Sequence, residues 1–103
     1  MINLVTVAGF DWDDGNREKS SKRHGISAVE TEEVFFNEPL IISEDTAHSQ
    51  AEERWQCLGR TNDDKKLFIS FTTRNNRLRV ISARLMSRKE RIHYEKAQKD
   101  TTI

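Results

Sequence analysis

Apolar and polar residues alternate along much of the second half of the chain, a period that is typical of half-buried β-strands. The alternating stretches cover residues 54–60, 67–73 and 77–85, and the apolar runs at residues 40–42 and around Val5, Val7 and Phe10 predict two further short strands. Polar connections at residues 61–64 and at Asn75-Asn76 separate the last three strands. Because such short connections join antiparallel neighbours, we predict a three-stranded meander.

Helix-start signals occur on both sides of these strands. Asp13 or Asp14 can cap a short polar helix over residues 16–23, and Gly25 supplies a left-handed stop after it. A serine and a glutamate three residues apart form the spacing of a capping box at two later places, Ser27 with Glu30 and Ser87 with Glu90. We therefore predict three helices.

The apolar residues of the second and third helices suggest how each one packs. The second helix carries Val29, Val34, Phe35 and Phe36 and ends before Pro39, and the third runs to about Lys99 with a narrow apolar stripe of Ile92, Tyr94 and Ala97. The first two helices have helix-turn-helix spacing. Phosphate would repel Glu30, Glu32 and Glu33, however, so a structural helix hairpin is the better interpretation.

These elements predict an α+β protein with an antiparallel sheet, formed by one domain over residues 1–103. The chain is 33% charged and 35% hydrophobic with eight aromatic residues, which argues against disorder. The lone Cys57 lies in an apolar stretch and is expected to be a buried small hydrophobe. With no disulfide framework, signal peptide or membrane-spanning stretch, a cytoplasmic protein without membrane contact is expected.

Charge is unevenly distributed, although the formal total is zero. Up to Glu53 four Lys and Arg face twelve Asp and Glu, whereas from Arg54 onward thirteen face five, so the two halves carry −8 and +8. The basic residues are interleaved with apolar ones on a predicted strand, so folding should hold the guanidinium groups in a rigid array. Guanidinium groups match phosphate oxygens in geometry, which predicts a polyanionic partner, either nucleic acid or an acidic protein.

Strict alternation on the last strand assigns its arginines to different faces. Arg77 and Arg79 share one face with Ile81, and Arg84 lies on the other, otherwise apolar face. An arginine there is either paired with a carboxylate at the rim of the core or directed into a cleft.

Several kinds of chemistry find little support in the sequence. The three histidines are far apart, no metal-ligand spacing occurs, and Cys57 lies within an apolar run, so we predict neither a metal nor a cofactor. Arginines beside a His, Glu or Tyr do suffice for metal-free RNA cleavage, in which the 2′-hydroxyl of the substrate is the nucleophile. Arginine-rich sheets also bind RNA without cutting it, so a non-catalytic RNA-binding or protein-interaction module stays open.

A set of short motifs resembles the BrnT toxin family over residues 10–95, almost the whole chain. The motifs are Phe10-Asp11-Trp12-Asp13, Arg23-His24-Gly25-Ile26-Ser27, Glu33-Val34-Phe35, Glu52-Glu53-Arg54, Leu58-Gly59-Arg60, Phe71-Thr72-Thr73-Arg74, Arg79-Val80-Ile81-Ser82-Ala83-Arg84, and Lys89-Glu90-Arg91 with Tyr94. No single motif is decisive, but the order and spacing of the set are specific. The family often has Lys where this chain has Arg23, and Arg cannot serve there in proton transfer.

The resemblance implies a RelE-like fold and a ribonuclease that blocks translation. It also implies a BrnA-type antitoxin that neutralises the toxin in a hetero-oligomer and represses their operon, so that DNA is contacted only through the antitoxin.

The resemblance and the charge pattern together nominate two sets of site residues. The predicted catalytic residues are Arg74, Arg79 and Arg84, which would stabilise the scissile phosphate, and His48, Glu53 and Tyr94, which would transfer protons. The predicted RNA-binding residues are Lys22, Arg23, His24, Arg54, Arg77 and Arg88. Simpler roles stay open: a solvent-exposed loop for His48, helix capping for His24, an ion pair between Glu53 and Arg54, and antitoxin docking or helix anchoring for Arg79, Arg84 and Tyr94.

Overall fold

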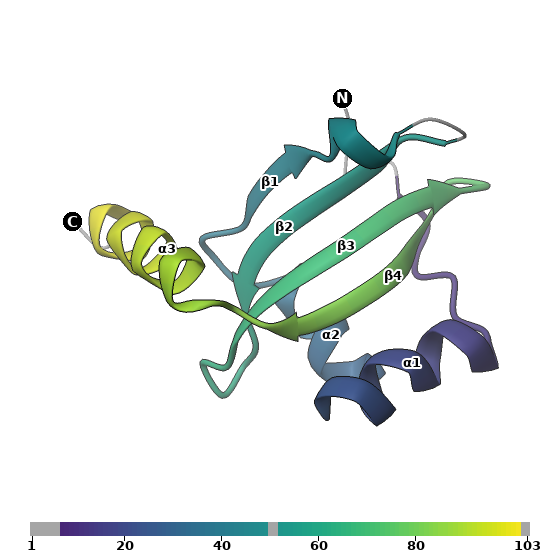
Figure 1. Cartoon of the computed structure of the whole chain (residues 1–103), viewed down its shortest axis with the longest axis horizontal. Coiled ribbons are helices and arrows are strands. Elements are labelled where there is room, and N and C mark those ends of the chain that lie inside the picture. The colour runs from purple at the N-terminus through teal and green to yellow at the C-terminus, as the bar shows by residue number, and fades with distance from the viewer. Residues whose placement is uncertain (1–6, 50–51, 102–103) are drawn as a thin grey trace.

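The computed structural model describes residues 7–49 and 52–101, which form a four-stranded antiparallel sheet with three α-helices (Figure 1). The strands are β1 (Ile41–Glu44), β2 (Arg54–Arg60), β3 (Lys66–Arg74) and β4 (Arg77–Leu85), and they lie in the order β1-β2-β3-β4. The predicted meander is therefore confirmed, and β1 extends it at the edge of β2. Asn75 and Asn76 both have positive φ in the turn between β3 and β4, a conformation that asparagine tolerates.

The predicted opening strand is mostly absent from the described residues. Val5 lies outside them, and Phe10 forms only an isolated parallel bridge to Leu78. Backbone hydrogen bonds join Gly9 and Asp11 to Leu78 on either side of that bridge. The segment therefore follows the edge of β4 without becoming a full strand.

The helix-start signals function as predicted. Asp13 caps α1 (Asp14–His24), and Gly25 ends it at φ 69°. Capping boxes open α2 (Ala28–Val34) and α3 (Arg88–Thr101), in each case with the serine and glutamate three residues apart. A short 3-10 helix, η2 (Thr46–His48), lies between β1 and β2.

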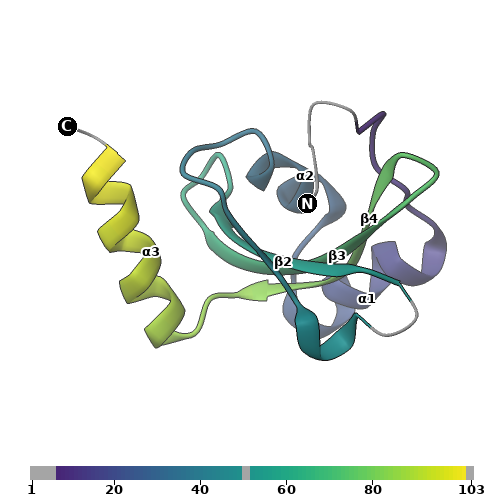
Figure 2. The same cartoon turned by 90° about the horizontal axis from the view of Figure 1, so that it is seen from above.

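The predicted packing stripes of α2 and α3 are partly wrong. Helix α2 ends at Val34, so Phe36 lies beyond the helix and is 79% exposed, and Val29 faces solvent as well. Ile92 of α3 is 58% exposed, whereas Tyr94 is fully buried. The C-terminal helix therefore meets the rest of the protein mainly through Tyr94, and it extends away from the sheet in both views (Figures 1 and 2).

The hydrophobic core fills the face of the sheet that α2 covers (Figure 2). Its buried members include Ile26, Val34, Trp55, Cys57, Leu67, Ile69, Phe71, Leu78, Val80 and Ala83, and the burial of Cys57 confirms its predicted role. Helix α2 approaches β2 so closely that a Cβ on Gly59 would lie 2.3 Å from Val34 Cγ1. Phe10, Phe35 and Phe71 add edge-to-face ring contacts at the rim.

Helix α1 lies along the outer edge of β4, where two of its polar side chains bind the strand backbone. The Asn16 side-chain amide donates to the Val80 carbonyl at 3.1 Å, and Ser20 Oγ accepts from the Ala83 amide at 2.8 Å. An edge strand has unpaired backbone groups, and these two bonds satisfy some of them. Both side chains are buried, so α1 is fixed against β4 by polar contacts.

A β-bulge in β4 changes the face on which Arg84 lies. Ser70 pairs with Ser82 but Phe71 pairs with Val80, which leaves Ile81 as an extra residue. One extra residue reverses the in-and-out alternation beyond it. Ala83 is therefore buried, and Arg84 shares a face with Arg77 and Arg79, so the predicted assignment of Arg84 to the opposite, apolar face is wrong.

The side of the sheet opposite α2 is covered much less, and we call it the open face. In Figure 2 it is bordered by η2 and by the start of α3. Its side chains come from all four strands: Ile41, Ser43, Arg54, Gln56, Leu58, Arg60, Lys66, Phe68, Ser70, Thr72, Arg74, Arg77, Arg79, Ser82 and Arg84. The predicted strand arginines therefore gather on one surface.

Candidate functional site

A row of three side chains crosses the open face at one end of the sheet. Thr72 on β3 pairs with Arg54 on β2 and with Arg79 on β4, so the two arginines flank the threonine. Neighbouring strands are about 4.8 Å apart, which separates the two arginine backbones by about 10 Å. Side chains of that length can converge on a single ligand group.

A shallow pocket of about 410 Å³ lies over this row, and we call it the arginine pocket. It is lined by Asp13, Gly15, Asn16, Lys19, Glu52, Arg54, Thr72, Arg74, Arg79, Val80 and Ile81. Four of these side chains are cationic and two are anionic, so the lining has a formal charge of +2. The fold thus brings Arg54, Arg74 and Arg79 together in one pocket. The net positive charge of the pocket and its guanidinium groups are suited to binding a phosphate group.

Arg79 is held by two carboxylates from the segment before α1. Its guanidinium donates to Asp13 Oδ2 at 2.7 Å and lies 3.5 Å from Asp11 Oδ1. The hydrogen bond to Asp13 is the main cause that raises the pKa of Arg79. The pKa of Asp13 is lowered, first by the amide hydrogen bond from Asn16 and then by Arg79. Arg79 is thus a fixed cation, with 19% of its side chain exposed.

The other two arginines of the pocket differ in their partners. Arg74 donates to both carboxylate oxygens of Glu52, at 3.3 and 3.2 Å. The Arg54 side chain has no hydrogen bond or ion pair with any described residue. Glu53 and Arg54 therefore do not form the ion pair that was the simpler alternative for them. Of the three arginines in the pocket, Arg54 is therefore the one most available to an incoming anion.

Arg84 lies at the other end of the open face and serves the start of α3. Its guanidinium binds both oxygens of Glu90, at 2.8 and 3.0 Å, and lies 4.2 Å from the centre of the Phe68 ring. The hydrogen bond from Arg84 is the main cause that lowers the pKa of Glu90. Of the two predicted situations for Arg84, pairing with a carboxylate is the one that the structure has.

Tyr94, predicted for proton transfer, is fully buried on the inner side of α3. Its hydroxyl donates to the Pro39 carbonyl at 2.6 Å, and burial raises the pKa of the phenol. The arrangement is that of a helix anchor, which was the simpler alternative for this residue. The phenol does not line the arginine pocket.

The other two predicted proton-transfer residues lie near the arginine pocket without lining it. The His48 ring in η2 bonds Asp45 at 3.0 Å, and Ser49 beside it accepts a hydrogen bond from the Arg54 amide. Glu53 is exposed and has no side-chain bond to a described residue. Both therefore lie next to the first residue of β2.

The remaining predicted RNA-binding residues are dispersed. Lys22, Arg23 and His24 are exposed at the end of α1, with Lys22 paired to Glu18 at 3.0 Å. Arg77 is exposed beside the turn that opens β4, and Arg88 is exposed at the start of α3. None of them lines the arginine pocket.

Sequence reasoning did not assign Lys19 to the site, and it chose Glu53 for proton transfer in place of its neighbour Glu52. A single lysine on a polar helix, or one glutamate in a Glu-Glu pair, gives no signal of its own. The periodicity of α1 together with the capping aspartate would have indicated that Lys19 and Gly15 share a face one turn apart.

No group of three His, Cys, Asp or Glu side chains that could hold a metal ion occurs within residues 7–49 and 52–101. Burial raises the pKa of the Cys57 thiol, which therefore stays protonated. In the same part of the chain no helix has the length and apolar composition needed to cross a bilayer.

Comparison with known families gives one match. The family model described as the ribonuclease toxin BrnT of a type II toxin–antitoxin system matches residues 12–90. That range includes α1, α2, the whole sheet and the first turn of α3. No curated protein matches the chain.

Proposed function

The chain belongs to the BrnT family of ribonuclease toxins of type II toxin–antitoxin systems, and from that membership we propose that it is an endoribonuclease that cleaves RNA on the open face of its sheet. The observation that carries the proposal is the arginine pocket, where Arg54, Arg74 and Arg79 come from three adjacent strands. Three guanidinium groups around one site can hold a phosphate and the extra charge of its transition state. The proposal includes a RelE-like scaffold and a single domain.

The proposed reaction needs no metal ion. The 2′-oxygen of RNA forms a bond to phosphorus while the bond from phosphorus to the 5′-oxygen breaks, which leaves a 2′,3′-cyclic phosphate and a 5′-hydroxyl. Arg54, Arg74 and Arg79 stabilise the phosphorane between these states. Glu52 is our choice to accept the 2′-hydroxyl proton because it lines the pocket, and His48 is our choice to protonate the leaving oxygen.

The proposed partner is a BrnA-type antitoxin that covers the open face and forms a hetero-oligomer with the toxin in the cytoplasm. The excess positive charge of the arginine pocket supports an acidic contact surface on the antitoxin. DNA would be reached only through the antitoxin.

The first test is cleavage of RNA by the purified chain in EDTA, comparing Arg54→Gln with Arg91→Gln. Arg54 has no ion pair to lose, so its removal should leave the fold intact while slowing cleavage about tenfold or more. Arg91 is an exposed arginine of α3 outside the pocket and serves as the charge-matched control. Equal rates for the two variants would contradict the proposed site.

The rival function, a non-catalytic binding module, makes a different prediction. Induced alone in a bacterium, the chain should arrest growth and shorten cellular RNA, and the cleaved ends should carry a cyclic phosphate or its hydrolysis product. Growth arrest with intact RNA would favour the binding module. Activity that EDTA abolishes and a divalent ion restores would contradict the metal-independent mechanism.

A further inference from the structure

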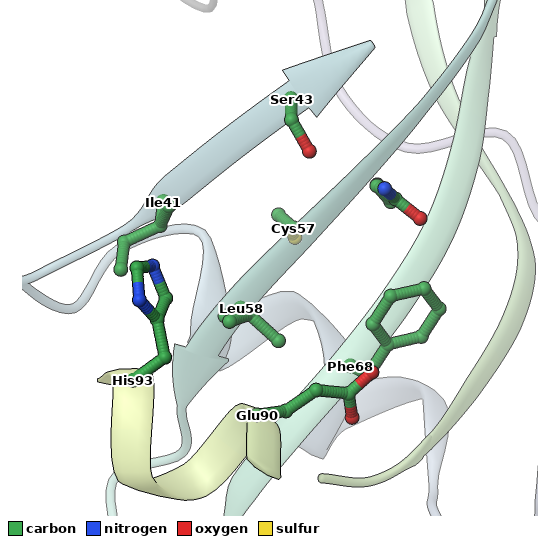
Figure 3. A pocket seen from close by; sticks show the side chains of 8 residues that line it. Ile41, Ser43, Cys57, Leu58, Phe68, Glu90 and His93 are labelled. Carbon is green, nitrogen blue, oxygen red and sulfur yellow. The ribbon is translucent and has the colours of Figure 1, made fainter. Parts of the chain in front are cut away.

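A second depression, which we call the α3 groove, lies on the open face between the sheet and the first turns of α3 (Figure 3). It has a volume of about 290 Å³ and is lined by Ile41, Ser43, Gln56, Cys57, Leu58, Phe68, Glu90 and His93. In Figure 3 the side chains of Leu58 and Phe68 form its floor, and His93 approaches Ile41 from the helix. None of the proposed catalytic residues lines it.

The groove combines an apolar floor with a few polar groups at its sides. Phe68 lines the groove, and the Arg84 guanidinium, which lies 4.2 Å from the centre of that ring, holds it in place from β4. Neither the Gln56 amide nor the Ser43 hydroxyl has a side-chain hydrogen bond within the described part of the chain. An aromatic surface beside free amide and hydroxyl groups is the arrangement that binds an unstacked nucleobase.

The groove and the arginine pocket lie at different positions along the same strands, β2 and β3. Gln56 follows Arg54 by two residues on β2, and Phe68 precedes Thr72 by four residues on β3, with all four side chains on the open face. At about 3.4 Å per residue these separations are about 7 and 14 Å. A single RNA strand can therefore place a phosphate among the arginines and a nearby base in the groove.

We propose that the α3 groove is a nucleobase-binding subsite, in which Phe68 stacks on a base of single-stranded RNA and Gln56 and Ser43 bind its polar edge. This inference rests on the proposed function for its choice of RNA as ligand. It goes further because it assigns base preference to residues outside the reacting centre. Gln56 can both donate and accept, so it can distinguish bases that present different edges.

The test uses oligoribonucleotides that are 2′-O-methylated throughout, which cannot be cleaved, and measures equilibrium binding by fluorescence anisotropy at one salt concentration. Abasic sites are introduced one position at a time. We expect one position at which the abasic substitution weakens binding about five- to hundredfold, the range for a stacked base. Phe68→Ala should weaken binding of the intact strand by a similar factor and make that abasic substitution neutral.

Matched variants separate the subsite from general effects on folding. Phe68→Leu keeps an apolar side chain beside Arg84 but removes the ring, and Phe36→Ala removes an aromatic ring that is 79% exposed and lies outside the groove. The first should behave like Phe68→Ala and the second like the parent chain. Gln56→Leu should change the order of preference among the four bases at the sensitive position.

Two results would overturn the subsite. One is equal RNA affinity for Phe68→Leu, Phe36→Ala and the parent chain. The other is loss of antitoxin binding by Phe68→Leu with RNA binding unchanged, which would make the groove an antitoxin-docking surface. Base-dependent binding of the blocked strands by a chain that leaves unblocked RNA intact would contradict the ribonuclease proposal alone.

Discussion

Arg79 and Arg84 lie on the same strand and the same face of the sheet, yet their surroundings differ in a way that separates two functions. At one end, Arg79 and two more arginines line a pocket in which cations outnumber anions by four to two. At the other end, Arg84 is neutralised by Glu90, and the depression beside it is apolar. Excess charge at the first end suits the phosphate, whereas Arg84 holds the start of α3 beside the groove. An arginine on a strand therefore acquires its role from the carboxylates that the fold brings to it.

The largest effect expected from this comparison is on the rate of RNA cleavage. Arg79→Ala removes a fixed cation from the pocket. It should therefore raise the activation free energy of single-turnover cleavage at saturating enzyme by about 2 to 4 kcal/mol. Arg84→Ala should lower it less than about tenfold, because that guanidinium is already paired at the other end.

A control for Arg79→Ala must separate lost catalysis from a lost ion pair. Asp13→Asn removes the carboxylate partner of Arg79 but retains the arginine and a residue that caps helices well. If Asp13→Asn slows cleavage as much as Arg79→Ala, the ion pair and not the cation is what the reaction needs. A slower rate for Arg84→Ala than for Arg79→Ala would reverse the assignment of the two ends.

The next effect concerns how α3 is anchored at the groove end. Tyr94→Phe leaves the Pro39 carbonyl without its 2.6 Å hydrogen bond, which should lower the free energy of unfolding by about 1–2 kcal/mol. Urea unfolding measures this loss, and the cleavage rate of the folded variant should stay within about twofold of the parent. A large loss of rate without a loss of stability would show that the phenol takes part in the chemistry.

Local signals in the sequence sufficed for most of the elements of this fold. The bounds of β2 and β4 agree with the predicted strands, and the caps at Asp13, Ser27 and Ser87 begin the three helices as predicted. Each of these signals lies within a stretch of at most nine consecutive residues. They can be identified without knowledge of the tertiary structure.

The candidate site was harder to predict because it depends on pairings between distant residues. The bulge at Ile81 has no marker such as a glycine, and it changed the face of Arg84. The acidic and basic halves of the sequence also meet in the fold, through Glu30 with Lys65, Glu52 with Arg74, and Asp13 with Arg79. The separation of charge along the sequence therefore overstated the polarity of the molecule, and only geometry shows that Arg54 stays unpaired among the described residues.

A smaller effect, on the stability of the fold, should depend on pH and tests the Arg84–Glu90 pair at the start of α3. The folded-state pKa of Glu90 lies below its ordinary value of 4.5, so its pair with Arg84 stabilises the fold above that pH and is lost as pH falls through the folded value. Glu90→Gln keeps a side chain suited to the capping box and should cost about 0.5–1 kcal/mol near neutral pH. The difference from the parent should shrink below about pH 4.5.

Urea unfolding of both chains at about pH 7 and about pH 3.5 checks this dependence. Glu95→Gln is the control, since Glu95 lies on the same helix as Glu90 but pairs with Lys66 of β3 and is 48% exposed. It should change stability less than Glu90→Gln at neutral pH. A loss for Glu90→Gln that is equal at both pH values would mean that packing, and not the charge of Glu90, supports the start of α3.

The smallest effect is expected at Arg77, which shares the open face with Arg79 but is exposed beside a turn. It has no side-chain bond to any described residue and does not line the arginine pocket. Arg77→Gln should therefore weaken RNA binding by about two- to threefold. The slope of log affinity against log salt concentration should fall by an amount equivalent to about one phosphate contact or less. The cleavage rate at saturating enzyme should stay unchanged. Binding isotherms at several salt concentrations and single-turnover cleavage measure the two quantities separately. A lower cleavage rate for Arg77→Gln at saturating enzyme would mean that the reacting centre extends beyond the arginine pocket. The two ends of the open face would then differ only in the neutralisation of Arg84 by Glu90.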